Sequence, residues 1–233
     1  MSLYLVATPI GNLGDITARA RETLAQADTL AAEDTRSARR LLAALDIPLQ
    51  GRELCSYGEH NEREMAARLG QLLAGGKSVA LFSEGGTPLI SDPGYRLVQA
   101  ALQAGVPVVP LPGPCAAIAA LCASGLPVHA FLFRGFLPKK PGARRRILED
   151  LAEREETLIF YESPQRLEAL LAEMAGLWGG GRQACIAREL TKFHESFWRG
   201  TLVELAGQAG QQAQTGALKG ECTVLVAGKK PLD

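Results

Sequence analysis

The sequence has no excess of charge of one sign and no long apolar run. Lys plus Arg and Asp plus Glu each number 25, so the formal net charge is +0. This balance gives no sign of a nucleic-acid or anionic-membrane partner, and any such partner must be met by a local patch. The opening apolar run, residues 3–8, lacks a basic flank and is too short for a signal peptide or a membrane span. We therefore expect a cytoplasmic protein without a membrane partner.

Cysteines are few, and they lack the spacing of a metal site. The chain has 5 of them, an odd number, widely spaced and mostly in apolar runs. We expect small buried thiols in a reducing cytosol and no bound metal, because no C-x-x-C pair or histidine cluster is present. The patterns G-x-G-x-x-G and G-x-x-x-x-G-K-[ST] are also missing, which argues against NAD or a nucleoside triphosphate held in those ways.

The sequence does contain an alternation of two kinds of segment. Short, continuously apolar runs are typical of strands buried on both faces, and the segments between them have helical spacing. This alternation predicts an α/β fold. The length of 233 residues suits two domains, which we place at 1–126 and 127–233, with the junction near the end of a small-residue helix. The apolar runs lie at 3–8, 78–83, 106–111, 130–135, 157–163, 184–189 and 222–228.

Three loops rich in glycine and proline follow expected strands, at residues 7–15, 83–94 and 111–117. Ligands of open α/β sheets lie beyond the carboxyl ends of the strands. Glycine allows close backbone approach and proline stiffens a turn, so such loops can offer fixed N–H and C=O groups to a small molecule. The alternative is that these residues only make tight turns.

Three acid–base side chains are candidate catalytic residues: Glu33, Asp34 and His60. Glu33 and Asp34 follow an apolar run, and His60 lies in the polar loop 57–64. A carboxylate or a histidine can accept a proton from a hydroxyl group. The alternatives are a helix cap beside a solvated charged face and an ordinary loop histidine.

Basic side chains gather in two places. Arg36 shares a helix face with two further arginines, and the stretch 136–146 is the most basic in the chain. Both are candidates for contact with RNA phosphates, although a solvated helix start explains the second equally well. The candidate RNA-binding residues are Arg36, Lys139, Lys140, Arg144, Arg145 and Arg146.

Several motifs, taken together and in order, resemble one family. They are "LYLVATPIGNLGDIT", "AAEDTR", "GTPLISDPGYRLV", "VVPLPGPCAAIAAL", "TLIFYESP", "ARELTK" and the final "KGE". The family is the tetrapyrrole (corrin/porphyrin) methylase superfamily, and within it the bacterial 16S rRNA (cytidine-2′-O)-methyltransferases. The resemblance implies a two-domain α/β methyltransferase, usually a homodimer, with S-adenosylmethionine in the cleft between the domains. The implied substrate is a cytidine ribose in 16S rRNA of the small ribosomal subunit.

The resemblance also implies which residues bind the cofactor and which accept the proton. The proton acceptor is Glu33 or Asp34 first, then His60. The family commonly has Asp-Ala where this chain has Glu84-Gly85, a change that keeps the charge but moves it by one methylene. The implied cofactor-binding residues are Pro9, Ile10, Gly11, Ser83, Glu84, Gly85, Gly86, Thr87, Pro88, Ile90, Pro112, Gly113, Ala116, Ala117, Tyr161 and Ala187.

Two alternative functions stay open at this point. One is methylation of a tetrapyrrole or another small acceptor, because the superfamily fold serves C-, N- and O-methylation. The other is a non-catalytic module that binds S-adenosylmethionine or RNA without turnover. The motifs "TPIGNLGDIT" and "AAEDTR" favour rRNA over the first alternative.

Overall fold

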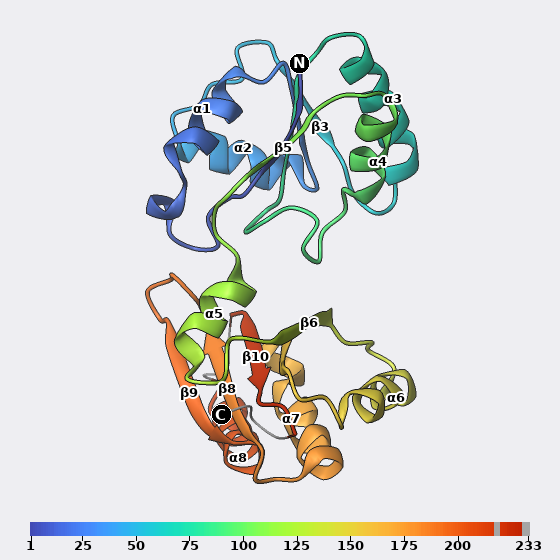
Figure 1. Cartoon of the computed structure of the whole chain (residues 1–233). Helices are drawn as coiled ribbons and strands as arrows, with labels where there is room; N and C mark the ends of the chain where they lie inside the picture. Colours follow the sequence, from blue (N-terminus) through green and yellow to red (C-terminus); the bar gives the residue numbers. More distant parts are fainter. Residues whose placement is uncertain (217–219, 230–233) are drawn as a thin grey trace. The chain divides into compact units, whose positions relative to one another are not determined.

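A computed structural model describes residues 1–216 and 220–229 of the chain. It divides into two compact units, Met1–Cys115 and Ala116–Asp233 (Figure 1). The sequence-based boundary after residue 126 lies beyond helix α5 (Ala116–Ser124), which the structure assigns to unit 2. The difference arises because α5 packs on strands of unit 2 described below. None of the helices in the described ranges is long and apolar enough to span a membrane.

Unit 1 is built on a five-stranded parallel sheet with the strand order β3-β2-β4-β1-β5. Its strands are β1 (Leu3–Val6), β2 (Thr29–Ala32), β3 (Glu53–Ser56), β4 (Val79–Phe82) and β5 (Val108–Leu111). Its helices are α1 (Ala18–Gln26), α2 (Thr35–Ala44), α3 (Glu62–Ala74) and α4 (Tyr95–Gln103), with a short 3-10 helix η1 (Leu13–Asp15).

Helices cover both faces of this sheet (Figure 1). Leu24 of α1 and Leu42 of α2 share an apolar cluster with Phe82 of β4. Leu69 of α3 and Leu97 of α4 belong to a second cluster on the opposite face. Burial on both faces explains why the strands are continuously apolar rather than alternating, as the sequence predicted.

The strand order makes neighbouring loops diverge at the carboxyl edge of the sheet. The chain leaves β4 toward α4 on one face, whereas it leaves the neighbouring strands β1 and β2 toward α1 and α2 on the other. Loops that diverge in this way leave a crevice where open α/β sheets bind ligands. The loop after β4, residues 83–94, therefore lies at the centre of the candidate site.

Unit 2 is built on a five-stranded mixed sheet with the order β6-β7-β10-β8-β9, in which β6 and β7 are parallel and the other pairs antiparallel. The strands are β6 (Phe131–Phe136), β7 (Thr157–Glu162), β8 (Gln183–Arg188), β9 (Ser196–Thr201) and β10 (Cys222–Val226). Besides α5, the helices are α6 (Pro141–Leu151), α7 (Pro164–Trp178) and α8 (Leu202–Gln214).

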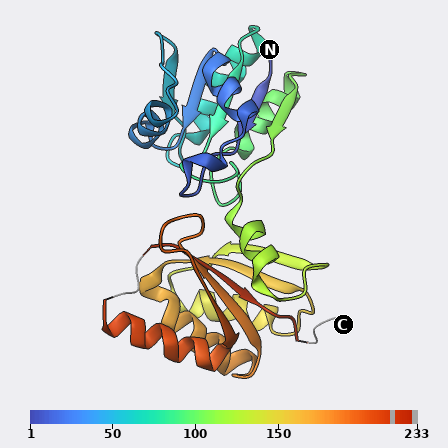
Figure 2. The same ribbon diagram turned by 90° about the vertical axis from the view of Figure 1, so that its left-hand side faces the viewer.

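The two faces of the unit-2 sheet are covered differently. Helices α6, α7 and α8 bury one face together with Phe160 and Ile186, and α7 packs beside α8 (Figure 2). Helix α5 contacts β7, β8 and β10. Because side chains alternate along a strand, Tyr161 and Ala187 point to the face opposite Phe160 and Ile186. Thr223 of β10 pairs with both Tyr161 and Ala187, so the three residues form one row across the sheet.

Candidate functional site

The loops after β1, β4 and β5 are bonded to one another. Thr8 and Gly86 exchange two backbone hydrogen bonds of 2.9 Å each. The Thr8 hydroxyl donates to the Ser83 carbonyl oxygen at 3.1 Å, and the Ser83 hydroxyl donates to the Gly86 carbonyl oxygen at 2.8 Å. The Thr87 hydroxyl donates to the carbonyl oxygen of Pro114 at 2.9 Å. The three loops therefore hold a common geometry at the edge of the sheet.

Glycine is required where these loops approach one another. A Cβ on Gly113 would lie 2.7 Å from the Cβ of Ala7, well inside van der Waals contact. Gly86 has a φ of 96°, which L side chains rarely adopt. A backbone surface without bulky side chains results, and it suits a small ligand that approaches main-chain groups closely.

Most predicted cofactor-binding residues of unit 1 belong to these loops. The buried residues of this set support the loops, whereas the exposed residues are accessible from solvent. Pro9, Ser83, Gly86 and Pro88 are buried, Ile10 and Thr87 are half-buried, and Gly11, Glu84, Gly85, Ile90, Pro112 and Gly113 are exposed.

The second half of the loop after β4 has a strained backbone. Leu89 and Ser91 have φ angles of 71° and 68°, in the left-handed region that non-glycine residues seldom occupy. A Cβ on Gly94, where φ is 148°, would lie 2.9 Å from side-chain atoms of both Leu81 and Leu89. Strain of this kind persists where the surrounding structure over-determines it, often at functional sites. Here it fixes the position of Asp92.

Asp92 lies near carboxylates from two loops. Burial first, then the charges of Glu33 and Glu84, raise the pKa of Asp92 to about 6. Burial and the charges of Glu33 and Asp34 raise the pKa of Glu84. A carboxyl group with a pKa near 6 is a better proton acceptor than an ordinary aspartate and is still ionised at neutral pH. Nothing local in the sequence around Asp92 marks this property, because it depends on burial and on carboxylates from other parts of the fold.

Asp34, by contrast, caps helix α2. Its Oδ1 accepts a hydrogen bond from the Arg36 backbone N–H at 2.7 Å, and its Oδ2 lies 3.2 Å from Arg36 Nη2. These contacts with Arg36 lower the pKa of Asp34. The alternative of a helix cap therefore describes the local geometry of Asp34, and its catalytic role stays a prediction. The Arg36 side chain is 83% exposed and accessible to a partner.

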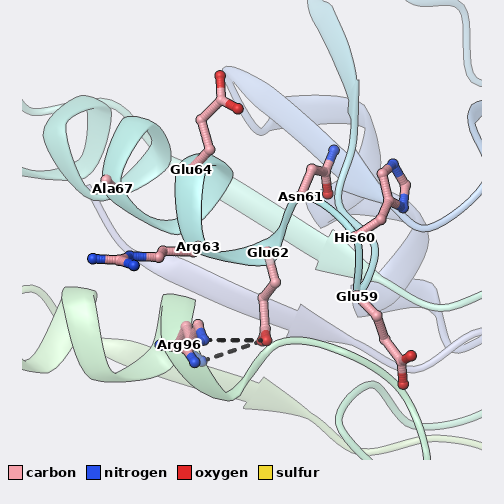
Figure 3. A pocket seen from close by; sticks show the side chains of 8 residues that line it. All are labelled: Glu59, His60, Asn61, Glu62, Arg63, Glu64, Ala67 and Arg96. Carbon is pink, nitrogen blue, oxygen red and sulfur yellow. Dashed lines mark hydrogen bonds and ion pairs between the residues drawn. The ribbon is translucent and has the colours of Figure 1, made fainter.

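His60 and Glu33 both lie near Gly58. A Cβ on Gly58 would be 3.1 Å from His60 Nδ1 and 3.7 Å from Glu33 Cγ. His60 is exposed and lines a pocket of about 570 Å³ at the start of α3 (Figure 3). The histidine therefore lies at the border between the carboxylates and this pocket.

In unit 2 the structure places two predicted cofactor-binding residues, Tyr161 and Ala187, on one face of the sheet and two more, Ala116 and Ala117, at the start of α5. The Tyr161 hydroxyl accepts a hydrogen bond from the Ala117 backbone N–H at 3.2 Å, in the first turn of α5. Its ring packs against Phe133 and Phe136, with centroid distances of 5.0 and 5.5 Å. Ala187 lies in the same row, and Ala116 begins α5. Their part in cofactor binding stays a prediction.

The predicted RNA-binding run of unit 2 is divided by the fold. Lys139, Lys140, Arg145 and Arg146 are exposed around the start of α6. Arg144 instead forms an ion pair of 2.6 Å with Glu173, and the two side chains are only 12% and 16% exposed. This pair joins α6 to α7, so Arg144 has a structural role.

No group of three or more His, Cys, Asp or Glu side chains within 1–216 and 220–229 is arranged to hold a metal ion. The described site therefore consists of backbone groups beside carboxylates.

Comparisons with known proteins give a family match over most of the chain. The family model of tetrapyrrole (corrin/porphyrin) methylases matches residues 2–206. A ribosomal RNA small subunit methyltransferase I from Mesorhizobium japonicum is 54% identical over 225 residues, which are 97% of this chain and 74% of the relative. The protein of that name from Pseudomonas aeruginosa is 49% identical over 231 residues, covering 97% of this chain and 79% of the relative.

Solved structures resemble the fold at low sequence identity. A cobalt precorrin-4 methyltransferase has a TM-score of 0.66 and 19% identity, covering 97% of this chain and 94% of its own. A uroporphyrin-III C-methyltransferase from Thermus thermophilus, complexed with S-adenyl homocysteine, has a TM-score of 0.63 and 21% identity and covers 97% of both chains. The predicted two-sheet α/β fold is thereby confirmed.

Proposed function

Because this chain belongs to the tetrapyrrole (corrin/porphyrin) methylase family, and within it to the ribosomal RNA small subunit methyltransferases I, we propose that it methylates RNA of the small ribosomal subunit. The methyl donor is S-adenosylmethionine. The acceptor is the ribose 2′-hydroxyl of a cytidine in 16S rRNA. The observation that carries this proposal is the juxtaposition, at one sheet edge, of a glycine-lined backbone surface and a carboxylate with a raised pKa.

The loops after β1, β4 and β5 fit the cofactor. Gly85, Gly86 and Gly113 leave backbone groups open, and each lies where an added Cβ would contact a neighbouring loop. When bound, S-adenosylmethionine supplies an electrophilic methyl group on a sulfonium. In the unit-1 loops, the segments Pro9 to Gly11, Ser83 to Ile90 and Pro112 to Gly113 would hold it. Glu84 contributes the negative charge there, one methylene farther from the backbone than the family's aspartate.

Asp92 accepts the proton of the ribose hydroxyl. A 2′-hydroxyl is a weak acid, so its oxygen becomes nucleophilic enough only as the proton departs. Burial, and then the charges of Glu33 and Glu84, raise the pKa of Asp92 to about 6, which makes Asp92 a stronger base while leaving it ionised above that pH. Glu33 and His60 are the adjacent groups that can pass the proton on to solvent.

Alignment of the two reactants supplies most of the remaining rate enhancement, about 7 to 11 kcal/mol in ideal cases. Arg36 and the exposed cations Lys139, Lys140, Arg145 and Arg146 hold the RNA backbone, since phosphate contacts set register and orientation. A cytoplasmic homodimer completes the proposal, and analytical ultracentrifugation of the purified chain tests the dimer.

The test is methyl transfer from labelled S-adenosylmethionine to 30S subunits from cells that lack this modification. We expect label at a single cytidine, in its ribose, mapped by nuclease digestion and mass spectrometry. A parallel reaction offers a free tetrapyrrole acceptor. Label in the tetrapyrrole would contradict the RNA assignment. Tight cofactor binding by calorimetry with no label in any acceptor would identify a binding module.

A further inference from the structure

A polar cavity lies beside His60, and apart from His60 its lining residues have no role in the reaction described so far. It has a volume of about 570 Å³ and lies where the starts of α3 and α4 meet (Figure 3). This volume is within the range of small-molecule sites, and a single nucleotide fits it. The lining residues are Glu59, His60, Asn61, Glu62, Arg63, Glu64, Ala67 and Arg96.

Glu62 fixes the geometry of this pocket. Its Oε1 accepts hydrogen bonds from the backbone N–H groups of Gly94 at 3.1 Å and Arg96 at 3.4 Å, at the start of α4. The same oxygen accepts the Tyr57 hydroxyl at 3.5 Å, and Oε2 lies 3.6 Å from Arg96 Nε. The Glu62 charge is therefore balanced by a helix start and a guanidinium, and it ties α3 to α4.

Arg63 and Arg96 of the pocket lining remain accessible, and the exposed Tyr95, which lies outside the lining, precedes Arg96 at the start of α4. The Arg96 side chain is 60% exposed. Arg63 is exposed, and no ion pair involves it within the described ranges. Tyr95, the first residue of α4, is 69% exposed. Exposed aromatic rings and guanidinium groups are the surfaces on which unstacked RNA bases and their phosphates bind.

One lining residue of the pocket, His60, lies near the carboxylate cluster. Like Glu33 of that cluster, it lies near Gly58. A nucleotide adjacent to one held at Glu33 and Asp92 would therefore meet this pocket first.

We propose that this pocket is a subsite for an unpaired RNA nucleotide next to the methylated one. Tyr95 stacks on its base, and Arg63 and Arg96 hold its phosphate. The side chains of Glu59 and Glu64 point away from the two arginines (Figure 3). Their negative charges disfavour a phosphate near them, so the arginines are the favoured phosphate position. This inference rests on the proposed function, because it requires an RNA substrate.

Three variants of the full chain test the subsite: Arg63→Ala, Tyr95→Ala and Tyr95→Phe. With 30S subunits as substrate, we expect Arg63→Ala to raise KM about fivefold and Tyr95→Ala about tenfold, with kcat retained. Tyr95→Phe keeps the wild-type KM because phenylalanine still stacks. The slope of log KM against log salt decreases by roughly 0.7 in Arg63→Ala and stays unchanged in Tyr95→Ala, since only the arginine meets a phosphate.

Arg68→Ala is the matched control. Arg68 lies on the same helix, is 50% exposed and pairs with Glu53 at 2.6 Å, but it does not line the pocket. Its KM and salt slope should equal those of the wild type. Equal values in Arg63→Ala, Tyr95→Ala and Arg68→Ala would overturn the subsite.

A binding measurement separates this inference from the proposed function. If the wild-type chain methylates no 30S subunits, the proposed function fails. Fluorescence anisotropy with a labelled single-stranded RNA oligonucleotide then decides the subsite by itself. Weaker binding by Arg63→Ala and Tyr95→Ala than by Arg68→Ala supports an RNA subsite, and equal binding overturns it.

Discussion

The carboxyl edge of the unit-1 sheet has two halves that differ in chemistry. The loops that follow β1 and β5 in the chain expose glycines and backbone groups, which are held in place by hydrogen bonds such as those between Thr8 and Gly86. The loops that follow β2 and β3 carry the side chains of Glu33 and His60 instead. The loop after β4 belongs to both halves, since it begins in the first and carries Asp92 into the second. In the proposed function, the first half binds the cofactor through backbone groups and the second half accepts the proton.

The largest expected effect comes from adding a side-chain carbon to the glycine-rich loops of the first half. Gly113→Ala would bring two Cβ atoms within 2.7 Å, which forces the loops after β1 and β5 apart. A displacement of about 1 Å at a reacting centre costs about 100-fold in rate, so we expect at least that loss of methyl transfer. Calorimetry should show weaker cofactor binding as the cause.

Gly176→Ala provides the control for this change. Gly176 lies within α7, and no atom lies within 4 Å of an added Cβ. We expect full activity and a gain in unfolding free energy of about 0.5 to 1 kcal/mol, because alanine favours the helix. Normal cofactor affinity in Gly113→Ala would show that the first half does not bind the cofactor.

In the second half, removal of the Asp92 charge alone should impair methyl transfer. Asp92→Asn should lower kcat by about 100-fold, the contribution typical of a general base, while the cofactor dissociation constant stays the same. The folded-state pKa of about 6 exceeds the ordinary aspartate value of 3.8, so ionisation of Asp92 destabilises the fold as pH rises through about 6. Asp92→Asn should therefore unfold at a higher temperature than wild type at pH 7.5. Unchanged kcat would exclude Asp92 as the proton acceptor.

A subtler change in the same half shifts the pH dependence. The wild-type rate should fall as pH drops through about 6, because Asp92 must be ionised to accept a proton. Glu33→Gln removes a negative neighbour, which lowers the pKa of Asp92 and moves this fall to lower pH. We compare the rate at pH 5.5 with the plateau rate at higher pH for each protein. This ratio should be about twofold larger in the variant than in the wild type. A pH–rate profile of kcat for both proteins measures this, and superimposed profiles would contradict the electrostatic coupling.

The smallest effect is expected at Asp34. Asparagine also caps helices, so Asp34→Asn should keep the bond to the Arg36 N–H and stay within about twofold of wild-type activity. Asp34→Ala removes the cap and should cost about 1 kcal/mol of stability, measured by thermal unfolding. A 100-fold loss of kcat in Asp34→Asn would return the role of proton acceptor to Asp34.

The sequence predicted most of the fold but missed three strands. Central strands such as β4 and β10 are buried on both faces and show as continuous apolar runs. Strand β2 is short and rich in alanine, which favours helices as much as strands. Strands β3 and β9 lie at the sheet edges, where partly exposed side chains break the apolar run.

The site was predictable where its signal is local. Glycine and proline at 83–94 indicated a ligand loop because their backbone preferences are intrinsic. The raised pKa of Asp92 was not predictable, since it depends on Glu33 from a different strand. Likewise Arg144 differs from its neighbours only through Glu173, on another helix. Interactions between residues that are distant in the chain cannot be recognised from the sequence around either residue.

If the cofactor and RNA bind as proposed, the loop after β4 makes the two halves thermodynamically interdependent. It is tied to Thr8 at one end and carries Asp92 at the other, with left-handed residues between that limit its freedom to bend. A ligand that orders one end therefore reduces the conformational entropy left to lose at the other. Such coupling is reciprocal, so whatever factor the cofactor adds to RNA affinity, RNA adds to cofactor affinity. Through this loop, the first ligand to bind prepares the site for the second.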